Sequence, residues 1–83
     1  MHIYSMSSQI QSIIFHRNYW NTYQASKWLS EHQYVPIKPV HVTSNYLRYR
    51  LQLPKMGAKY RTIDFGDHIK AIIRVIRKSR RKI

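Results

Sequence analysis

The side chains best suited to chemistry lie between residues 46 and 53, where the residue types alternate. In a β-strand, Tyr46, Arg48 and Arg50 would share one face. The opposite face would carry the apolar side chains Leu47, Tyr49, Leu51 and Leu53. Arg pairs with phosphate through parallel hydrogen bonds, and a Tyr ring can stack on an unpaired base. The pattern is typical of a surface that binds nucleic acid, but also of the solvated outer face of an ordinary sheet.

A second group of basic residues follows this segment. It consists of Lys55, Lys59 and Arg61, and Gly57 among them would allow the backbone to approach a phosphate closely. A flexible, solvated loop has the same composition, so both interpretations stay open. If the group binds an anion, these three cations contribute, with Arg48 and Arg50, to capture of the DNA backbone.

A third basic group lies at the end of the chain, in residues 77–82. Its five cations are Arg77, Lys78, Arg80, Arg81 and Lys82. Runs of this kind contact nucleic acid or direct nuclear import, and they also occur in tails that only increase solubility. We expect residues 77–83 to form a basic tail that contacts nucleic acid or serves in targeting.

The net charge points to a polyanionic partner. The 83 residues include 15 Lys and Arg but only three acids, and the formal net charge is +12. The chain cannot neutralise so large an excess by itself, and the self-repulsion opposes folding. A membrane surface is also anionic, but the longest apolar runs, such as Ala71–Ile73, are far shorter than the roughly 20 residues of a spanning helix.

Catalytic and metal-binding patterns are weak. The three carboxylates, on Glu31, Asp64 and Asp67, are too few for a two-metal site. The His residues, at positions 2, 16, 32, 41 and 68, lack the spacing of metal ligands, and Cys is absent. The triplet Asp64-Phe65-Gly66 has the same residues as a metal-binding motif of kinases. The other kinase motifs do not accompany it, so the match does not indicate a kinase. We expect no enzyme, no metal and no cofactor; a small nuclease is the least favoured hypothesis.

Two elements are indicated in the first half of the chain. Residues 10–15 are largely β-branched and bounded by polar residues, which predicts a strand. Asn21 is a suitable N-cap, and Ala25, Trp28 and Leu29 then fall on one face of a helix. Pro36 constrains the backbone of the residue before it, so we expect the helix to cover residues 22–32.

The second half of the chain is predicted to be mostly extended. Residues 37–42 contain Pro39, which predicts an edge strand or an irregular segment. Residues 43–45 resemble a turn, residues 46–53 form the clearest strand, and residues 60–65 form a short extended piece closed by Gly66. Residues 69–76 fit a strand or a helix capped by Asp67, and their β-branched residues favour the strand.

These elements predict an α+β fold in the order strand, helix, strand, strand, strand. A small antiparallel sheet would carry the helix on one face. We expect a flexible lead over residues 1–9, one domain over residues 10–76 and the basic tail after it. The predicted core consists of Trp28, Leu29, Leu47, Tyr49, Leu51 and one face of residues 69–75.

The combination of aromatic and basic motifs resembles a family of short, basic proteins of large DNA viruses of amoebae, such as the marseilleviruses, and of some tailed phages. The residues that carry the resemblance are Trp20, Ala25, Trp28, Leu29, His32, Pro36, Ile37, the stretch from Val40 to Arg50, Arg61–Gly66 and Ile69–Ile73. Members often have Gly where this chain has Gln33 and Arg74. The resemblance implies a viral setting and an accessory or structural role without catalysis.

We therefore expect an accessory protein of viral type that binds nucleic acid, DNA rather than RNA, mainly through its backbone. With about five phosphates neutralised, log affinity should fall with log salt at a slope of about −4.5 on duplex DNA. The small core also suggests a homodimer. The expected location is intracellular, in the viral factory, the host nucleus or the virion. The alternative is a structural virion protein, a minor capsid or cementing component, that contacts acidic viral proteins.

Overall fold

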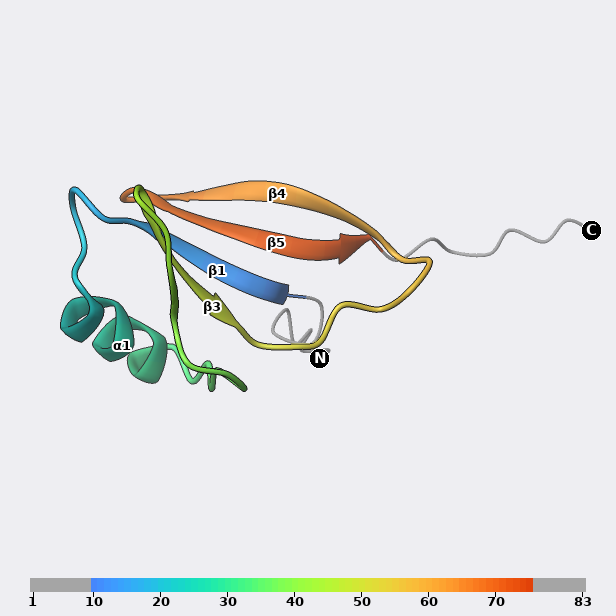
Figure 1. The fold of residues 1–83 in the computed structure, drawn as a ribbon, viewed down its shortest axis with the longest axis horizontal. Coiled ribbons are helices and arrows are strands. Elements are labelled where there is room, and N and C mark those ends of the chain that lie inside the picture. The colour runs from blue at the N-terminus through green and yellow to red at the C-terminus, as the bar shows by residue number, and fades with distance from the viewer. Residues whose placement is uncertain (1–9, 76–83) are drawn as a thin grey trace, which may run out of the picture.

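A computed structural model describes residues 10–75 and contains five strands and one helix (Figure 1). In chain order the elements are β1 (Ile10–His16), α1 (Thr22–Glu31), β2 (His41–Val42), β3 (Tyr46–Arg50), β4 (Lys59–Gly66) and β5 (Ile69–Val75). The strands form one antiparallel sheet in the order β2-β3-β1-β5-β4. The predicted α+β class is confirmed. The predicted lead (1–9) and basic tail (77–83) lie outside the described residues.

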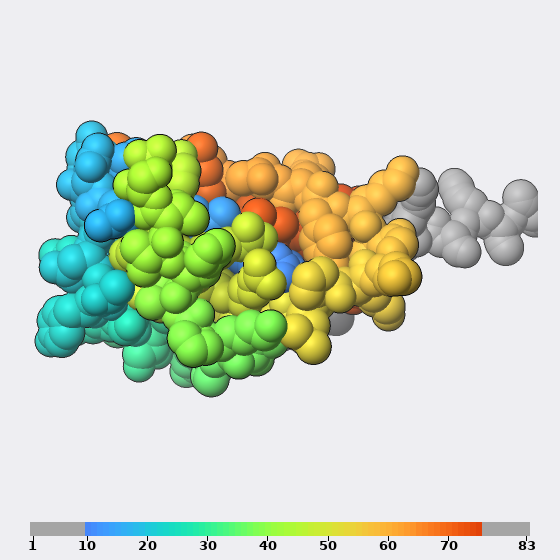
Figure 2. All heavy atoms as spheres, viewed as in Figure 1, coloured from blue at the N-terminus to red at the C-terminus, as the bar shows by residue number. Residues whose placement is uncertain are grey.

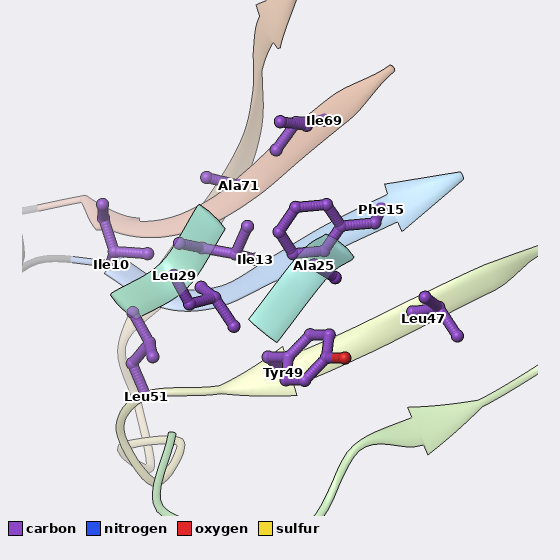
Figure 3. Packing of buried hydrophobic residues seen from close by; sticks show 10 residues of the cluster. All are labelled: Ile10, Ile13, Phe15, Ala25, Leu29, Leu47, Tyr49, Leu51, Ile69 and Ala71. Atoms are coloured by element: carbon purple, nitrogen blue, oxygen red, sulfur yellow. The ribbon is translucent and has the colours of Figure 1, made fainter. Parts of the chain in front are cut away.

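β1 is the central strand, and its alternation places Ile13 and Phe15 between the sheet and α1. Both side chains are fully buried, and those of Ala25 and Leu29 in the helix are at most 1% exposed. The buried cluster consists of Ile10, Ile13, Phe15, Ala25, Leu29, Leu47, Tyr49, Leu51, Ile69 and Ala71 (Figure 3). The core predicted from the helix and β3 is confirmed, with Trp28 half-buried against it. Of the predicted face of β5, Ile69 and Ala71 are buried and Ile73 is half-buried, but Val75 is 41% exposed. The contribution of β1 to the core was not predicted.

The helix begins where the sequence predicts. The Asn21 side chain accepts the backbone N–H of Gln24 at 2.8 Å, and the Gln24 side chain accepts the backbone N–H of Asn21 at 3.1 Å. This reciprocal pair is a capping box, which satisfies two backbone donors that the first turn leaves without partners. The helix therefore starts at Thr22.

The helix ends at Glu31, one residue before the predicted end, in a Schellman motif. The N–H of Tyr34 donates to the carbonyl of Leu29 at 2.9 Å, and the N–H of Gln33 donates to that of Ser30 at 3.1 Å. This geometry needs a left-handed residue after the cap, and Gln33 has φ of 64°. Glycine is the usual residue here because a Cβ atom strains the left-handed conformation.

Replacing Gln33 by Gly is expected to raise the free energy of unfolding by about 1 kcal/mol, because it removes the strain of a left-handed residue with a side chain. For a domain of this size the melting temperature should rise by about 4–8 °C. Thermal unfolding followed by circular dichroism measures it. Gln33→Ala is the matched control and should change little, since Ala keeps the Cβ atom. Equal stability of the two variants would contradict the left-handed cap.

Of the two extended segments before residue 54, one ends earlier than predicted and the other agrees with its prediction. β3 ends at Arg50 and not at Leu53, because the carbonyl of Gln11 accepts the N–H groups of both Leu51, at 2.8 Å, and Gln52, at 3.3 Å. The regular ladder cannot continue past this point, and Leu53 is 63% exposed although it was predicted on the apolar face. Residues 37–42 are irregular except for the two residues of β2, which form an edge of the sheet, in agreement with the prediction.

The strand interpretation is correct for residues 69–75, since β5 pairs with both β1 and β4. Residue 76 lies outside the described residues. A two-residue turn joins β4 to β5, and its residues Asp67 and His68 have φ of 55° and 63°. Two positive φ angles are the signature of a type I′ turn, whose twist matches that of the strands. Asp67 is therefore a turn residue and not a helix cap. Within residues 10–75, no helix has the length and apolar character needed to cross a membrane.

Candidate functional site

The sheet has one face that α1 does not cover, which we call the open face. Strand register fixes which side chains lie on it, because directly paired residues point to the same side. Arg48 pairs with Ile14, Ile14 with Lys70, and Lys70 with Asp64. These four residues form a row across β3, β1, β5 and β4. The neighbouring row consists of Tyr49, Ile13, Ala71 and Ile63, and it faces the helix side, where the first three are buried and Ile63 is half-buried.

Two further rows add basic and aromatic side chains to the open face. Arg50 pairs with Ser12 in β1, and Tyr60 pairs with Arg74 between β4 and β5. The cations of the open face are thus Arg48, Arg50, Lys70 and Arg74, and its one strand carboxylate is that of Asp64. In Figure 2, atoms of β1 (blue) and β5 (red) are visible in a hollow between the green and orange segments, so other elements do not fully cover the central strands.

The two arginines of β3 lack carboxylate partners. Both are half-buried, and the Nε atom of Arg48 donates to Ser12 Oγ at 3.4 Å. Burial lowers the pKa of the Arg48 guanidinium below its usual value, and the charge of Arg50 lowers it further. Because the folded state lowers the pKa of this base, folding disfavours its charged form. Among residues 10–75 no ion pair offsets that cost, and an anion bound on the open face would do so.

Replacing Arg48 by Met is expected to leave the free energy of unfolding unchanged or to raise it, because Met keeps the aliphatic stem and removes a partly desolvated charge. The contrasting variant is Arg17→Met. Arg17 is exposed, but its Nη1 donates to the carbonyl of Thr43 at 2.7 Å, so its loss should cost about 1 kcal/mol. Urea unfolding without nucleic acid measures both. A larger loss for Arg48→Met than for Arg17→Met would show that Arg48 serves the fold.

One end of the open face forms a pocket of about 370 Å³, which we call the end pocket. Half-buried Ile14 lies at its lining, and the functional side chains around it are His16, Tyr46, Asp64, Asp67, His68 and Lys70. The ring centroids of His16 and Tyr46 are 5.3 Å apart and those of His16 and His68 are 6.4 Å apart. The pocket thus combines aromatic rings, two carboxylates and an ammonium group.

The wall of the end pocket at the β4–β5 turn is held from three sides. Trp20 Nε1 donates to the carbonyl of Asp67 at 2.8 Å, and the N–H of His16 donates to the carbonyl of His68 at 3.1 Å. The ring of Tyr19 stacks on that of His68 with centroids 3.5 Å apart. The turn is therefore fixed in place before any ligand arrives.

A second hollow, of about 280 Å³, lies at the other end of β5. It is lined by residues 55–58 together with Arg74 and Val75. Gly57 has φ of 81°, and the N–H of Ala58 donates to the carbonyl of Lys55 at 3.1 Å, so residues 55–58 form a tight turn. The Nε atom of Arg74 is buried and has no hydrogen-bond partner among the described residues. A second cationic group lies here, formed by Arg74 and Lys55.

The structure divides the residues singled out from the sequence. It places Tyr46, Arg48 and Arg50 together on the open face and Lys55 beside Arg74. Lys59 and Arg61, however, pair with Val75 and Ile73, so they point to the helix side of the sheet. They therefore do not share a face with Arg48 and Arg50, because β4 alternates and presents Tyr60, Thr62 and Asp64 on the open face. Their contact with nucleic acid stays a prediction. The tail residues Arg77, Lys78, Arg80, Arg81 and Lys82 lie outside the described residues.

Three residues of the open face were missed: Lys70, Arg74 and His16. The signal for the first two was present, since the alternation that puts Ile69, Ala71 and Ile73 on one face puts Lys70 and Arg74 on the other. His16 had no such signal, because only the strand pairing brings it beside Tyr46. Its Nδ1 accepts the N–H of Asn18 at 3.2 Å, which leaves its Nε2 to carry the ring proton as a donor.

Metal chemistry finds no support in the part of the chain that the structure describes. Within residues 10–75, no three His, Asp or Glu side chains gather closely enough to hold a metal ion. What the open face offers is four cations, aromatic rings and a pocket that can hold one planar group. Neither a family model nor a curated protein nor a solved structure matches the chain, so the resemblance to viral proteins stays a prediction.

Proposed function

We propose that the protein binds nucleic acid across the open face of its sheet. The observation that carries the proposal is the gathering of Arg48, Arg50, Lys70 and Arg74 on one face without an ion pair among the described residues. Half-burial already reduces the hydration of the two arginines. A row of phosphates supplies the anions that these groups lack, and guanidinium binds phosphate through two parallel hydrogen bonds.

The spacing of the cations favours a regular polyanion. Arg48 and Arg50 are two residues apart on one strand, a separation of about 6.6–6.8 Å, and Lys70 lies two strands away from Arg48, at about 10 Å. The first distance is similar to that between successive phosphates of an extended nucleic-acid strand. Tyr46 and Tyr60 lie on the same face and can stack on bases. An acidic protein would meet the cations but would make no use of these two half-buried rings.

Fluorescence anisotropy with labelled oligonucleotides, measured over a series of salt concentrations, tests the proposal. Four phosphate contacts on a single strand should give a slope of log affinity against log salt of about −3. Polyglutamate serves as the competitor control, because it carries charge without bases and should displace the oligonucleotide poorly. Absence of binding at low ionic strength, or equal competition by polyglutamate, would refute the proposal. The homodimer, the preference for DNA and the viral setting stay predictions.

A further inference from the structure

We propose that the end pocket receives one unpaired guanine base, so that the protein prefers single strands that carry guanine. The inference rests on the proposed function and extends it from the phosphates to a base. It starts from a feature that phosphate binding leaves unexplained: two carboxylates, Asp64 and Asp67, line a pocket in a face otherwise rich in cations. Carboxylates repel phosphate, so they weaken backbone binding unless they accept hydrogen bonds from something else.

The pocket has the size and the walls that a base requires. Its volume of about 370 Å³ lies at the small end of ligand pockets. Ile14 supplies an apolar surface, and the rings of His16 and Tyr46 meet at 69°, so that each offers a different surface to a planar ligand. A duplex keeps its bases stacked inside, where they cannot reach such a pocket. Single strands expose them, and aromatic side chains on a sheet commonly bind them.

The polar groups of the pocket match guanine. Asp64 and Lys70 are direct partners in the β4–β5 ladder and face the same side. The Watson–Crick edge of guanine presents two adjacent donors, N1–H and the N2 amino group, beside the acceptor O6. A carboxylate can accept both donors, and a neighbouring ammonium can donate to O6. Adenine and cytosine present one amino group beside an acceptor, and thymine has a single donor between two carbonyls, so none of them fits this pair as well.

The pocket is also prepared for its ligand. Asp64 Oδ1 accepts the N–H of Gly66 at 2.7 Å, which orients the carboxylate. Asp67 and His68 both have positive φ angles, although each carries a Cβ atom. The sequence Asn-Gly would form this turn with less strain. Trp20 and Tyr19 hold that turn in place. Binding a base therefore orders few side chains, which keeps the entropic cost of binding low.

The test uses thymine oligonucleotides that contain one central guanine, inosine or adenine, or none, measured by anisotropy over one series of salt concentrations. The guanine strand should bind about tenfold more tightly than the all-thymine strand. Inosine lacks only the N2 amino group and should lose most of this gain. The salt slopes should differ by at most about 0.7, the contribution of one phosphate contact, because Lys70 alone can exchange a phosphate for the O6 atom of guanine. Equal affinity of all four strands would overturn the guanine pocket while leaving the proposed function intact.

Asp64→Asn distinguishes recognition of the guanine base from repulsion between the carboxylate and phosphate. Asn can still accept the N–H of Gly66, so the bulge is kept, but a neutral acceptor forms weaker hydrogen bonds with guanine. The preference for guanine should fall from about tenfold to about threefold, while all-thymine binding should stay equal or become tighter. Glu31→Gln is the matched control, with the same change of charge at an exposed position at the end of α1, and should keep the preference. Equal tightening of both strands by Asp64→Asn would show that the carboxylate only repels phosphate.

If no oligonucleotide binds, the proposed function is refuted. Nuclear magnetic resonance then tests separately whether the end pocket binds guanine. Guanosine monophosphate and inosine monophosphate, added to the labelled protein, differ only in the N2 amino group. Stronger shifts of the Asp64, Lys70 and His68 amide signals with the guanine nucleotide would support the pocket. Identical responses to the two nucleotides, or none, would overturn it.

Discussion

Replacing Arg48 and Arg50 together by Gln is expected to weaken binding of a single-stranded oligonucleotide about a hundredfold. Each guanidinium contributes a charge-assisted hydrogen bond to phosphate, and the loss of one such bond costs about 1.5 kcal/mol. The slope of log affinity against log salt should become shallower by about 1.4, since about 0.7 is lost for each phosphate on a single strand. Both quantities come from one anisotropy series.

The matched control is the double variant Lys59→Gln with Arg61→Gln. It removes the same two charges, and both residues lie in a strand of the same sheet, but they point to the helix side. Only the long-range effect of net charge is lost, so affinity should fall by less than about threefold at moderate salt. Equal losses in the two variants would show that the total charge binds nucleic acid and that the open face has no special role.

The melting temperature distinguishes a loss of binding contacts from a loss of affinity caused by unfolding. The charge of Arg48 is disfavoured in the free protein, because burial and the nearby charge of Arg50 lower the pKa of its guanidinium. The double variant should therefore melt at the same temperature as the parent chain or above it, although it binds far more weakly. Loss of affinity together with a lower melting temperature would place the arginines in the fold instead of the binding surface.

The sequence was a reliable guide wherever one element carried the whole signal. Asn21 marks the start of α1 because an N-cap acts within three residues, and the alternation from Tyr46 to Arg50 shows the two faces of β3. The strand assignment of β5 follows from its β-branched residues. In these cases the residues that fix the structure are neighbours in the chain.

The candidate site was harder to foresee because three of its features depend on pairing between distant segments. The end pocket joins His16, Tyr46 and Lys70, which come from three different strands. The side of the sheet on which Arg61 lies could be assigned only from the register of β4. This strand lies at the edge of the sheet, so buried and exposed side chains alternate only weakly along it. The early end of β3 at Arg50 depends on Gln11, which lies far away in sequence.

Phe15→Ala is expected to have the largest effect on stability. The ring is fully buried in the central strand and packs edge-on against Tyr49 and Trp28, with centroids 5.6 Å away in both cases, and against Trp20 at 5.1 Å. Removing such a ring costs about 3–5 kcal/mol, while a domain of this size has a total stability of about 4–12 kcal/mol. The melting temperature should fall by about 15–30 °C. If the total stability lies at the low end of its range, the variant should be largely unfolded.

Ile14→Ala is the informative comparison, because the next residue of β1 points to the open face. Ile14 is half-buried at the lining of the end pocket, so its truncation should cost about 1 kcal/mol of stability. Strand alternation makes the two variants a direct test of orientation: a shift of register by one residue would exchange the faces of β1. If Ile14→Ala destabilised the protein as much as Phe15→Ala, the open face would be buried, and the arginines, the pocket and the binding surface built on them would have to be placed elsewhere.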